Sequence, residues 1–489
     1  MDNLKKKTLS GFFYSFAERG ASQGISFVVQ IILARILMPE EFGTVALLTV
    51  LMTILDVFVT YGFGNSLVVN KKSDDLDFST CFFFGLFLAS TLYGVVYVCS
   101  PHISQYFYGN DGLDLLVKVI ALRMPIAAVN SVQHAYIQKK MLFRLFFYAT
   151  LVGSLLSGVV GITMAYLGFG VWALAAQNLS NSLFNTITLW IASEWRPKCM
   201  FSFHRLKAIY DYGWKILVVG LIDTIFGQIR SLVIAKQYSR SDLAYYNRGV
   251  GFPGFGMKLI EPTINKVLFP ALSNCNDDQK LMKTITQRII KTSTFLICGI
   301  MFLLMAMAKP LIAVLLTDKW LPCVIYLQIG CLAYMLRPLQ VINACVIRAS
   351  GNSSLLLKLD ILKKSIGLAL LLLAMPFGVE AIAWSYFGFC FISTIINIYP
   401  NKSILKYGFL EQFTDLGGNL WVAIIVGIFV WLISLLPFND ITLLSIQIIV
   451  AVILYLLICK VIKVESYMYL SQLIGELLKK YHKQSKSFS

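Results

Sequence analysis

The stretch Leu33–Gly43, LARILMPEEFG, closes the first long apolar run of the chain. It places a base, Arg35, four residues before a proline and two glutamates, which an apolar segment alone does not require. The same arrangement returns at Ala235–Ala244, AKQYSRSDLA, where a base, an acid and an apolar residue stand at equal spacing. Both stretches lie at the end of an apolar run, so they indicate an internal duplication.

Two further echoes keep the same order along the chain. LRMPIAAVN at Leu122–Asn130 matches LRPLQVIN at Leu336–Asn343 with one residue deleted, and GFGV at Gly168–Val171 matches PFGV at Pro376–Val379. The three matches predict a duplicated six-helix bundle with both halves starting from the same side of the membrane. Parallel repeats of this kind are typical of transporters whose binding site lies between the halves. The predicted parts are an N-terminal lobe 1–208, a C-terminal lobe 209–405, two additional helices within 406–463 and a basic cytoplasmic tail 464–489.

The composition is that of an integral membrane protein. The chain has 489 residues, of which 57% are hydrophobic and 14% charged, and its mean hydropathy is +0.73. Soluble domains carry about 25% charged residues. The net charge of +17 does not indicate nucleic acid binding, because the charges lie in short loops between apolar runs. The ten cysteines form no CxxC pair, so neither a disulfide framework nor a metal site is predicted.

A spanning helix needs about 20 mostly apolar residues. The windows that meet this requirement predict fourteen helices: 11–35, 43–69, 78–99, 113–136, 145–167, 169–192, 209–235, 249–271, 292–316, 323–346, 355–375, 379–400, 418–436 and 441–462. Most loop lysines and arginines fall on one side of this arrangement, which predicts that both termini are cytoplasmic. The opposite side holds only a few basic residues: Arg35, Lys236, Arg240, Arg248 and Lys319.

A set of motifs in a fixed order carries a resemblance to a known family. The set comprises LARILMPEEFG, GFGNSLVV at 62–69, EWRPKCMFS at 194–202, DLAYYNRG at 242–249, FPALS at 269–273 and AKPLIAVLLTDKW at 308–320. Together they resemble the polysaccharide transporters of the MOP exporter superfamily, which include the Wzx-type flippases of O-antigen, capsule and exopolysaccharide repeat units. The resemblance covers nearly the whole chain, although no single motif is diagnostic.

The resemblance implies an all-α membrane fold with two six-helix lobes forming a V around a central cavity. It implies that oligosaccharide linked to undecaprenyl pyrophosphate moves from the cytoplasmic to the outer leaflet of the bacterial inner membrane by alternating access. It further implies antiport coupled to H⁺ or Na⁺, with no other cofactor. The expected partners are the lipid-linked substrate, membrane lipids and a polysaccharide polymerase or other pathway proteins. In such a fold, Pro39 and the acidic pair after it would start a short outer loop.

Charged residues inside the apolar windows supply the candidate site. A charge at mid-bilayer costs about 2.5–3.5 kcal/mol on insertion scales, so it should face a wet cavity or a partner. Arg123 and Arg337 stand in matched contexts and are predicted to contact the pyrophosphate as a pseudo-symmetric pair, since Arg binds phosphate in bidentate fashion. Alternatively, each arginine pairs locally or reaches an interface. The other basic candidates are Arg19, Lys215, Arg230, Lys258 and Lys266.

Ion coupling requires a carboxylate that can exchange H⁺ or Na⁺. Asp56 is the first choice, because no basic residue lies within four positions of it in sequence. The other candidates are Glu18, Asp223, Glu261 and Asp360. Lys215, Asp223 and Arg230 fall on roughly one helix face, which fits either a polar stripe along the cavity or a structural ladder of ion pairs.

Two other functions remain open from the sequence. A multidrug or small-molecule exporter of the same superfamily is the first, although the excess of intramembrane bases favours an anionic head group over a cationic drug. A membrane enzyme of the polysaccharide pathway is the second, but the outer loops are short and His102 and His134 are isolated in sequence. No catalytic pattern of nucleophile and base appears there. No nucleotide-binding loop is present, so the chain alone cannot drive transport with ATP.

Overall fold

The computed structural model describes residues 20–60, 63–69, 73–109, 112–275, 278–462, 464–468 and 471–472. Throughout these residues the regular structure is helical, and the described part of each of the fourteen predicted windows falls on one helix or on consecutive helices. Among the described residues, ten helical segments are long and apolar enough to cross a membrane. The all-α membrane fold is therefore confirmed, whereas the number of crossings stays a prediction.

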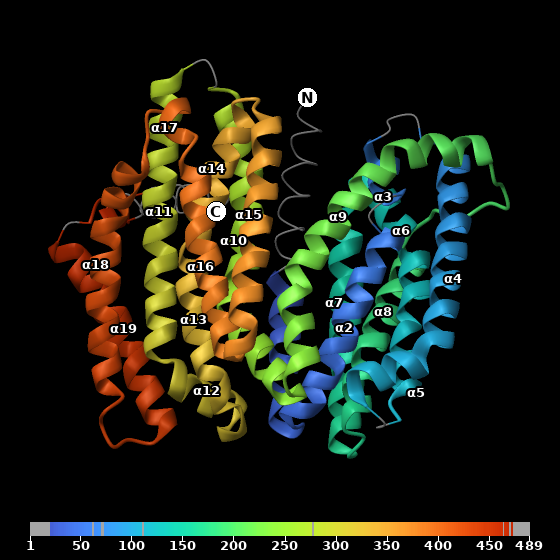
Figure 1. The fold of residues 1–489 in the computed structure, drawn as a ribbon, viewed down its shortest axis with the longest axis horizontal. Helices are drawn as coiled ribbons and strands as arrows, with labels where there is room; N and C mark the ends of the chain where they lie inside the picture. The colour runs from blue at the N-terminus through green and yellow to red at the C-terminus, as the bar shows by residue number, and fades with distance from the viewer. Residues whose placement is uncertain are drawn as a thin grey trace, which may run out of the picture. The chain divides into compact units, whose positions relative to one another are not determined.

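The helices follow one another with short connections (Figure 1). After a first helix at Gly20–Ile36, they are α2 (Pro39–Thr60), α3 (Phe63–Val69), α4 (Asp75–Tyr108), α5 (Asp114–Ala121), α6 (Arg123–Lys139), α7 (Phe143–Tyr166), α8 (Val171–Ala192), α9 (Phe203–Gln237), α10 (Arg240–Ser273), α11 (Gln279–Ala306), α12 (Ala308–Leu316), η1 (Asp318–Cys323), α13 (Val324–Met335), α14 (Arg337–Ala349), α15 (Ser353–Ala374), η2 (Met375–Phe377), α16 (Val379–Ile398), α17 (Asn401–Ile404), α18 (Phe409–Ile433) and α19 (Asp440–Val461).

The chain divides into two compact units. Unit 1 comprises Met1–Ala244 and unit 2 comprises Tyr245–Ser489. Unit 1 runs from blue to green in Figure 1, and unit 2 continues to red. The division into two compact units does not test the lobe boundaries at 208 and 405. Those boundaries rest on the sequence repeats and stay predictions.

The opening motif and its echo are two helix starts. Pro39 is the first residue of α2, and the N–H of Met38 donates to Oε2 of Glu41 at 2.7 Å. At the start of α10, the N–H of Ser239 donates to Oδ2 of Asp242 at 3.2 Å, and the N–H of Asp242 donates to Oγ of Ser239 at 3.1 Å. A reciprocal pair of this kind is a capping box. The prediction that Pro39 and the acidic pair start a loop is therefore wrong, because these residues form the first turn of α2.

Gly43 explains why the motif ends in glycine. A Cβ atom at this position would lie 1.8 Å from the backbone oxygen of Arg240. The Arg240 guanidinium also approaches Glu40, with Nη1 3.7 Å from Oε1. The first turns of α2 and α10 thus touch backbone to backbone, and any larger side chain at position 43 would push them apart.

The fourth predicted window of unit 1 and its counterpart in unit 2 are interrupted at the same place. Leu122 separates α5 from α6, and Leu336 separates α13 from α14. A proline follows closely in both cases, Pro125 and Pro338, and it cannot donate the backbone hydrogen bond of a regular helix. Each break therefore makes an arginine the first residue of the second half, as the echo between LRMPIAAVN and LRPLQVIN anticipates.

In unit 1, α7 packs closely along α8. A stripe of small residues spaced by four faces this contact: Ala149, Gly153, Ser157, Gly161 and Ala165 are all buried. A Cβ atom at Gly161 would lie 2.7 Å from Cβ of Gln177 on α8. Small residues let two membrane helices approach closely, so this stripe fixes the position of α8.

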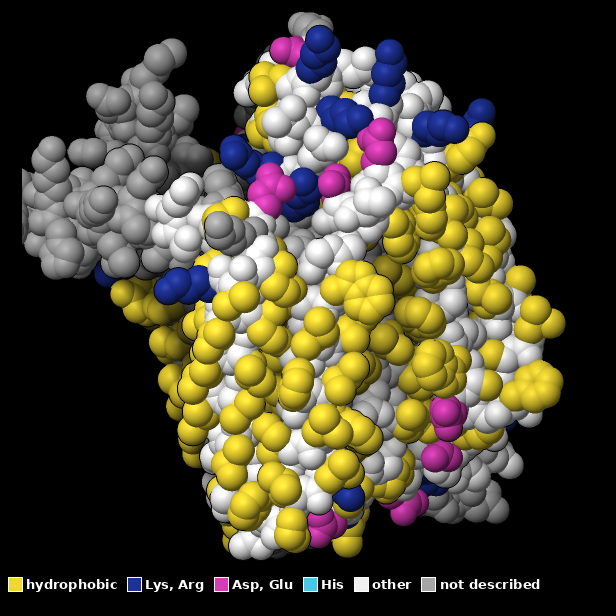
Figure 2. Space-filling model, turned by 90° about the vertical axis from the view of Figure 1, so that its left-hand side faces the viewer, with side chains coloured by type: hydrophobic (Ala, Val, Ile, Leu, Met, Phe, Trp, Pro, Cys, Tyr) yellow, Lys and Arg dark blue, Asp and Glu magenta, His cyan; other side chains and the backbone are white. Residues whose placement is uncertain are grey.

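In unit 2, the additional helix α18 packs against α11. Ion pairs join the two at one end, with Lys283 Nζ 2.8 Å from Glu411 Oε2 and Lys291 Nζ 3.4 Å from Asp415 Oδ1. Figure 2 shows the face over α18 and α19, where hydrophobic side chains form a broad band and charged side chains gather mostly at the top. A wide apolar band of this kind suits contact with lipid.

Candidate functional site

Asp56, near the end of α2, forms an ion pair with Arg123 at the start of α6. Asp56 Oδ2 lies 3.1 Å from Arg123 Nη2, and the two side chains are 13% and 32% exposed. The residues meet because α2 packs against α6. The last turn of a helix disfavours a negative charge, and Arg123 compensates for it. Oδ1 of Asp56 is buried and accepts no hydrogen bond from the described part of the chain.

Unit 2 repeats this arrangement with other residues. Nη2 of Arg337, at the start of α14, donates to Oε1 and Oε2 of Glu261 at 3.0 and 2.9 Å. Nη1 of Arg337 lies 3.4 Å from Oε1 of Gln340. Both predicted arginines thus contact a carboxylate from the second predicted helix of their own half. Local pairing, which was the alternative for each arginine, is what the structure shows.

Arg123 also lines a polar pocket of about 350 Å³ inside unit 1. Asn130, His134 and Gln138 on α6 and Asn181 and Asn185 on α8 contribute most of its polar groups. The Nδ2 of Asn130 donates to Oδ1 of Asn185 at 3.0 Å, and the Nδ2 of Asn181 donates to Ser157 Oγ on α7 at 3.1 Å. Within the described residues, the buried Oδ1 of Asn130 accepts no hydrogen bond.

The counterpart of Asn130 in unit 2, Asn343, lies in a filled core instead. Its Nδ2 donates to Gln412 Oε1 at 2.8 Å, and its Oδ1 accepts from Asn401 at 2.6 Å and from Gln412 at 3.0 Å. All three amides are completely buried or nearly so. Next to them, burial and a hydrogen bond to Asp415 raise the pKa of Tyr407 far above its ordinary value, so its hydroxyl remains a donor.

The remaining predicted residues lie on other helices, or their side chains lie outside the described residues. On α9, Lys215 and Asp223 are exposed whereas Arg230 is buried, so they do not share one environment. Asp360 Oδ1 pairs with Lys363 Nζ at 2.6 Å on the same helix. Glu18 and Arg19 lie outside the described residues, as do the side chains of Lys258 and Lys266.

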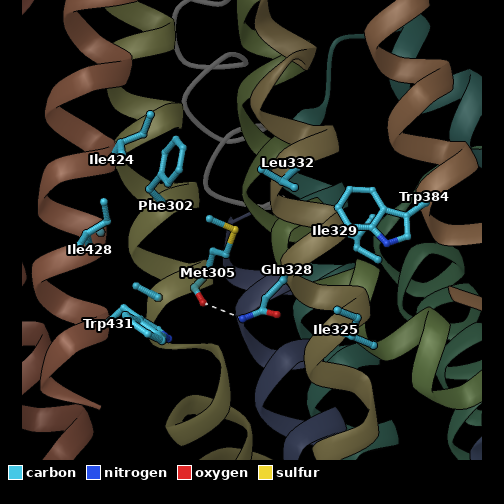
Figure 3. A pocket seen from close by; sticks show the side chains of 12 residues that line it. Phe302, Met305, Ile325, Gln328, Ile329, Leu332, Trp384, Ile424, Ile428 and Trp431 are labelled. Carbon is cyan, nitrogen blue, oxygen red and sulfur yellow. Dashed lines mark hydrogen bonds between the residues drawn. The ribbon is translucent and has the colours of Figure 1, made fainter. Parts of the chain in front are cut away.

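A second pocket of about 350 Å³ lies in unit 2 and has a different character (Figure 3). Its walls are apolar side chains of α11, α13, α16 and α18, including Phe302, Trp384 and Trp431. Its one amide, Gln328, donates through Nε2 to the backbone oxygen of Met305 at 3.4 Å. This lining suits hydrocarbon and offers no charge for a phosphate.

The polar pocket of unit 1 is the feature that the sequence interpretation missed. His134 looks isolated along the chain, but Asn130, His134 and Gln138 are spaced by four and therefore share one face of α6. Asn181 and Asn185 have the same spacing on α8. Polar periodicity inside two apolar windows is the signal that could have found this pocket.

Comparison with known proteins gives the family. Residues 32–325 match the family model described as "Polysaccharide biosynthesis protein". The chain belongs to this family. The resemblance seen in the sequence motifs is therefore confirmed.

Several relatives in this family are transport or biosynthesis proteins by name. The succinoglycan biosynthesis transport protein ExoT of Rhizobium meliloti (strain 1021) is 25% identical over 307 residues, a match that spans 63% of this chain and 62% of ExoT. The lipopolysaccharide biosynthesis protein WzxC of Escherichia coli (strain K12) is 21% identical, over 74% of both chains. The teichuronic acid biosynthesis protein TuaB of Bacillus subtilis (strain 168) is 22% identical, over 72% of both.

Several solved transporter structures have a fold similar to that of this chain. The lipid II flippase MurJ in an inward closed conformation has a TM-score of 0.73 and 13% identity, covering 93% of this chain and 98% of MurJ. An inward-facing multidrug resistance MATE transporter has a TM-score of 0.62 and 16% identity, covering 81% of this chain and 95% of that one. At these identities, the likeness shows the fold and not the substrate.

Proposed function

We propose that the chain is a flippase, and not an enzyme, for oligosaccharide repeat units linked to undecaprenyl pyrophosphate. It moves them from the cytoplasmic to the outer leaflet of the bacterial inner membrane by ion-coupled alternating access, with both termini cytoplasmic. The family and the names of its relatives support a role in surface polysaccharide export. The observation that carries the proposal is the repeated ion pair, Asp56–Arg123 and Glu261–Arg337.

The repeated pair suits a phosphate-binding role for two reasons. Keeping a carboxylate and a guanidinium within a membrane bundle costs desolvation free energy that apolar residues would not incur. Each arginine also opens the second half of an interrupted helix, and interrupted helices line the substrate sites of many transporters. The guanidinium is a planar donor that matches phosphate oxygens in bidentate fashion. In the proposed cycle, pyrophosphate replaces the carboxylate as the partner of arginine.

The carboxylates of the two pairs supply the coupling. Asp56 and Glu261 are the groups proposed to take up the coupling ion from the outer side and to release it to the cytoplasm, in exchange for the lipid-linked substrate. H⁺ or Na⁺ is thus the proposed coupling ion.

A flipping assay in liposomes tests the function. The purified protein is reconstituted with fluorescent undecaprenyl-pyrophosphate oligosaccharide, and protection from a membrane-impermeant quencher is followed with and without a pH or Na⁺ gradient. Protein-dependent and gradient-sensitive redistribution is the expected result. If folded protein redistributes none of the host's own lipid-linked glycans but is stabilised against heat by small organic cations, the exporter alternative replaces the flippase.

Four variants test the ion pairs in this assay. Arg123→Ala and Arg337→Ala should each lower the flipping rate at least about tenfold, the equivalent of about 1.4 kcal/mol. Asp56→Asn and Glu261→Gln should retain flipping but lose its dependence on the gradient. Lys118→Ala is the matched control, because Lys118 pairs within α5 with Asp114 at 2.9 Å. Normal rates in both arginine variants at normal protein levels would overturn the role of the pairs.

A further inference from the structure

We infer that the polar pocket of unit 1 is a binding site for a neutral, hydroxyl-rich sugar ring of the transported glycan. This inference rests on the proposed function, because it assigns the sugar part of the same substrate. The pocket lies in unit 1 alone and is lined by α6 and α8, together with Thr60 and Gly64.

The chemistry of the lining fits a sugar better than an ion or a hydrophobic molecule. Arg123 is the one charged side chain among the described residues that line the pocket. The other polar groups are amides, an imidazole and hydroxyls, and each can both donate and accept or can rotate to do so. Sugar hydroxyls require this mixture of donors and acceptors. A cationic drug would find no carboxylate in this lining, and an acidic sugar would find only one guanidinium, that of Arg123.

One lining atom still lacks a donor. Oδ1 of Asn130 is buried and accepts no hydrogen bond within the described residues, while its Nδ2 is already engaged with Asn185. A buried acceptor without a donor is unfavourable, because it has lost its hydrogen bonds to water without replacement. A hydroxyl of a bound sugar would supply the donor, and the pocket would therefore favour occupation by a hydroxylated ligand.

The pocket is held in place by helix packing and not by loops. A Cβ atom at Gly153 on α7 would lie 3.2 Å from Cβ of Asn185, so α7 and α8 already touch beside the pocket. Ser157, on the same stripe of small residues, accepts the hydrogen bond from Asn181. Rigid elements position binding groups more precisely than loops do. The amides of α8 are thus oriented before a ligand arrives.

Size and position fit the sugars nearest the lipid. A volume of about 350 Å³ is near the lower end for small-molecule sites, which is room for about one or two rings. Arg123 lines the same pocket, so a pyrophosphate at Arg123 would direct its attached sugar towards the amides. A site that hydrogen-bonds a hydroxyl discriminates strongly against analogues lacking it. The pocket would therefore select the glycan by its hydroxyl pattern.

A binding experiment on the full chain in lipid nanodiscs tests the inference. The probes are the oligosaccharide released from the host's lipid-linked repeat units and, separately, inorganic pyrophosphate, each titrated calorimetrically. Asn181→Ala and Asn185→Ala should weaken glycan binding about five- to tenfold, the loss of about one hydrogen bond each, and leave pyrophosphate binding within about twofold. Ser182→Ala, which removes one lining hydroxyl, should weaken glycan binding less and is the variant to use if the larger changes reduce folding.

Asn178→Ala is the matched control on the same helix. Asn178 lies one turn before Asn181, does not line the pocket and donates to the backbone oxygen of Leu174 at 3.0 Å. It should bind glycan as the wild type does. Wild-type affinity in Asn181→Ala, Asn185→Ala and Ser182→Ala would overturn the inference. A wild type that binds pyrophosphate but binds no glycan at about 10 mM, a free energy of binding weaker than about −2.7 kcal/mol, would also overturn the inference. The flippase proposal would survive that result. Absence of flipping in liposomes would instead contradict the proposed function.

Discussion

Asn130 in unit 1 and Asn343 in unit 2 stand at the same position of a repeated motif, yet their surroundings differ. Asn130 lines a polar pocket and leaves its Oδ1 without a donor from the described residues. Asn343 lies in a filled core, where its side chain joins Gln412 of α18 and Asn401. The first position keeps hydrogen-bonding capacity for a ligand, whereas the second uses that capacity to hold the chain together.

The additional helices explain this divergence. In the predicted duplication, α18 is one of the two helices added after the second lobe, and its Gln412 reaches the asparagine of the repeat. A duplicated bundle that gained two helices could use one copy of the asparagine to dock them and keep the other copy for substrate. The two Arg–carboxylate pairs, in contrast, are preserved in both units, which fits a task that both halves share.

The largest expected effect is a difference in thermal stability between variants of the two asparagines. Asn343→Leu should leave Oε1 of Gln412 buried without its donor, and it also removes the Oδ1 that accepts from Asn401 and Gln412. A buried group left unpaired costs about 1–3 kcal/mol. Asn130→Leu loses the hydrogen bond to Asn185 but also removes a buried acceptor that lacks a donor among the described residues, so its net cost should be less than about 0.5–1.5 kcal/mol, the value of one hydrogen bond. The midpoint of thermal unfolding of the purified variants, followed by intrinsic fluorescence, should fall much further for Asn343→Leu. Equal shifts would mean that the two sites are alike and would break the comparison.

A smaller difference in stability is expected between two glycine variants, one at a close helix contact in unit 1 and one at a looser contact in unit 2. Gly161→Ala places a Cβ atom 2.7 Å from Cβ of Gln177, which should cost about 1–3 kcal/mol as overpacking and weaken glycan binding by shifting α8. Gly388→Ala on α16 meets only Leu370 Cδ1 at 4.0 Å. It should be neutral, or stabilising by about 0.5–1 kcal/mol as a helix residue. Thermal midpoints and glycan titrations of both variants check this contrast. Loss of stability in Gly388→Ala would show that α16 packs at Gly388 as tightly as α7 packs at Gly161.

The sequence predicted the helices and the matched arginines because both depend on local pattern. Apolar windows mark membrane helices, and the Arg-Pro echo marks the break that places Arg123 and Arg337. The carboxylate partners could not be predicted, since each lies on a helix distant in sequence. Asp56 even looked isolated because no base lies near it along the chain, and packing of α2 on α6 supplies one. Whether these residues bind substrate or ion stays a prediction.

The smallest expected effect concerns the two helix starts of the opening motif. Ser239 and Asp242 cap α10 reciprocally, so Ser239→Ala should cost about 1 kcal/mol. At α2, the side chain of Glu41 makes only one capping hydrogen bond within the described residues, which it accepts from the N–H of Met38. Glu41→Ala should therefore cost less, about half as much on the same scale. Thermal midpoints of the two variants, with Glu40→Ala as a control beside Glu41, check the order. A larger loss of stability in Glu41→Ala would show that the Glu41 carboxylate has a role beyond capping. Its contact with Gly170 would be the first to test, because a Cβ atom built on Gly170 would lie only 2.5 Å from Oε1 of Glu41.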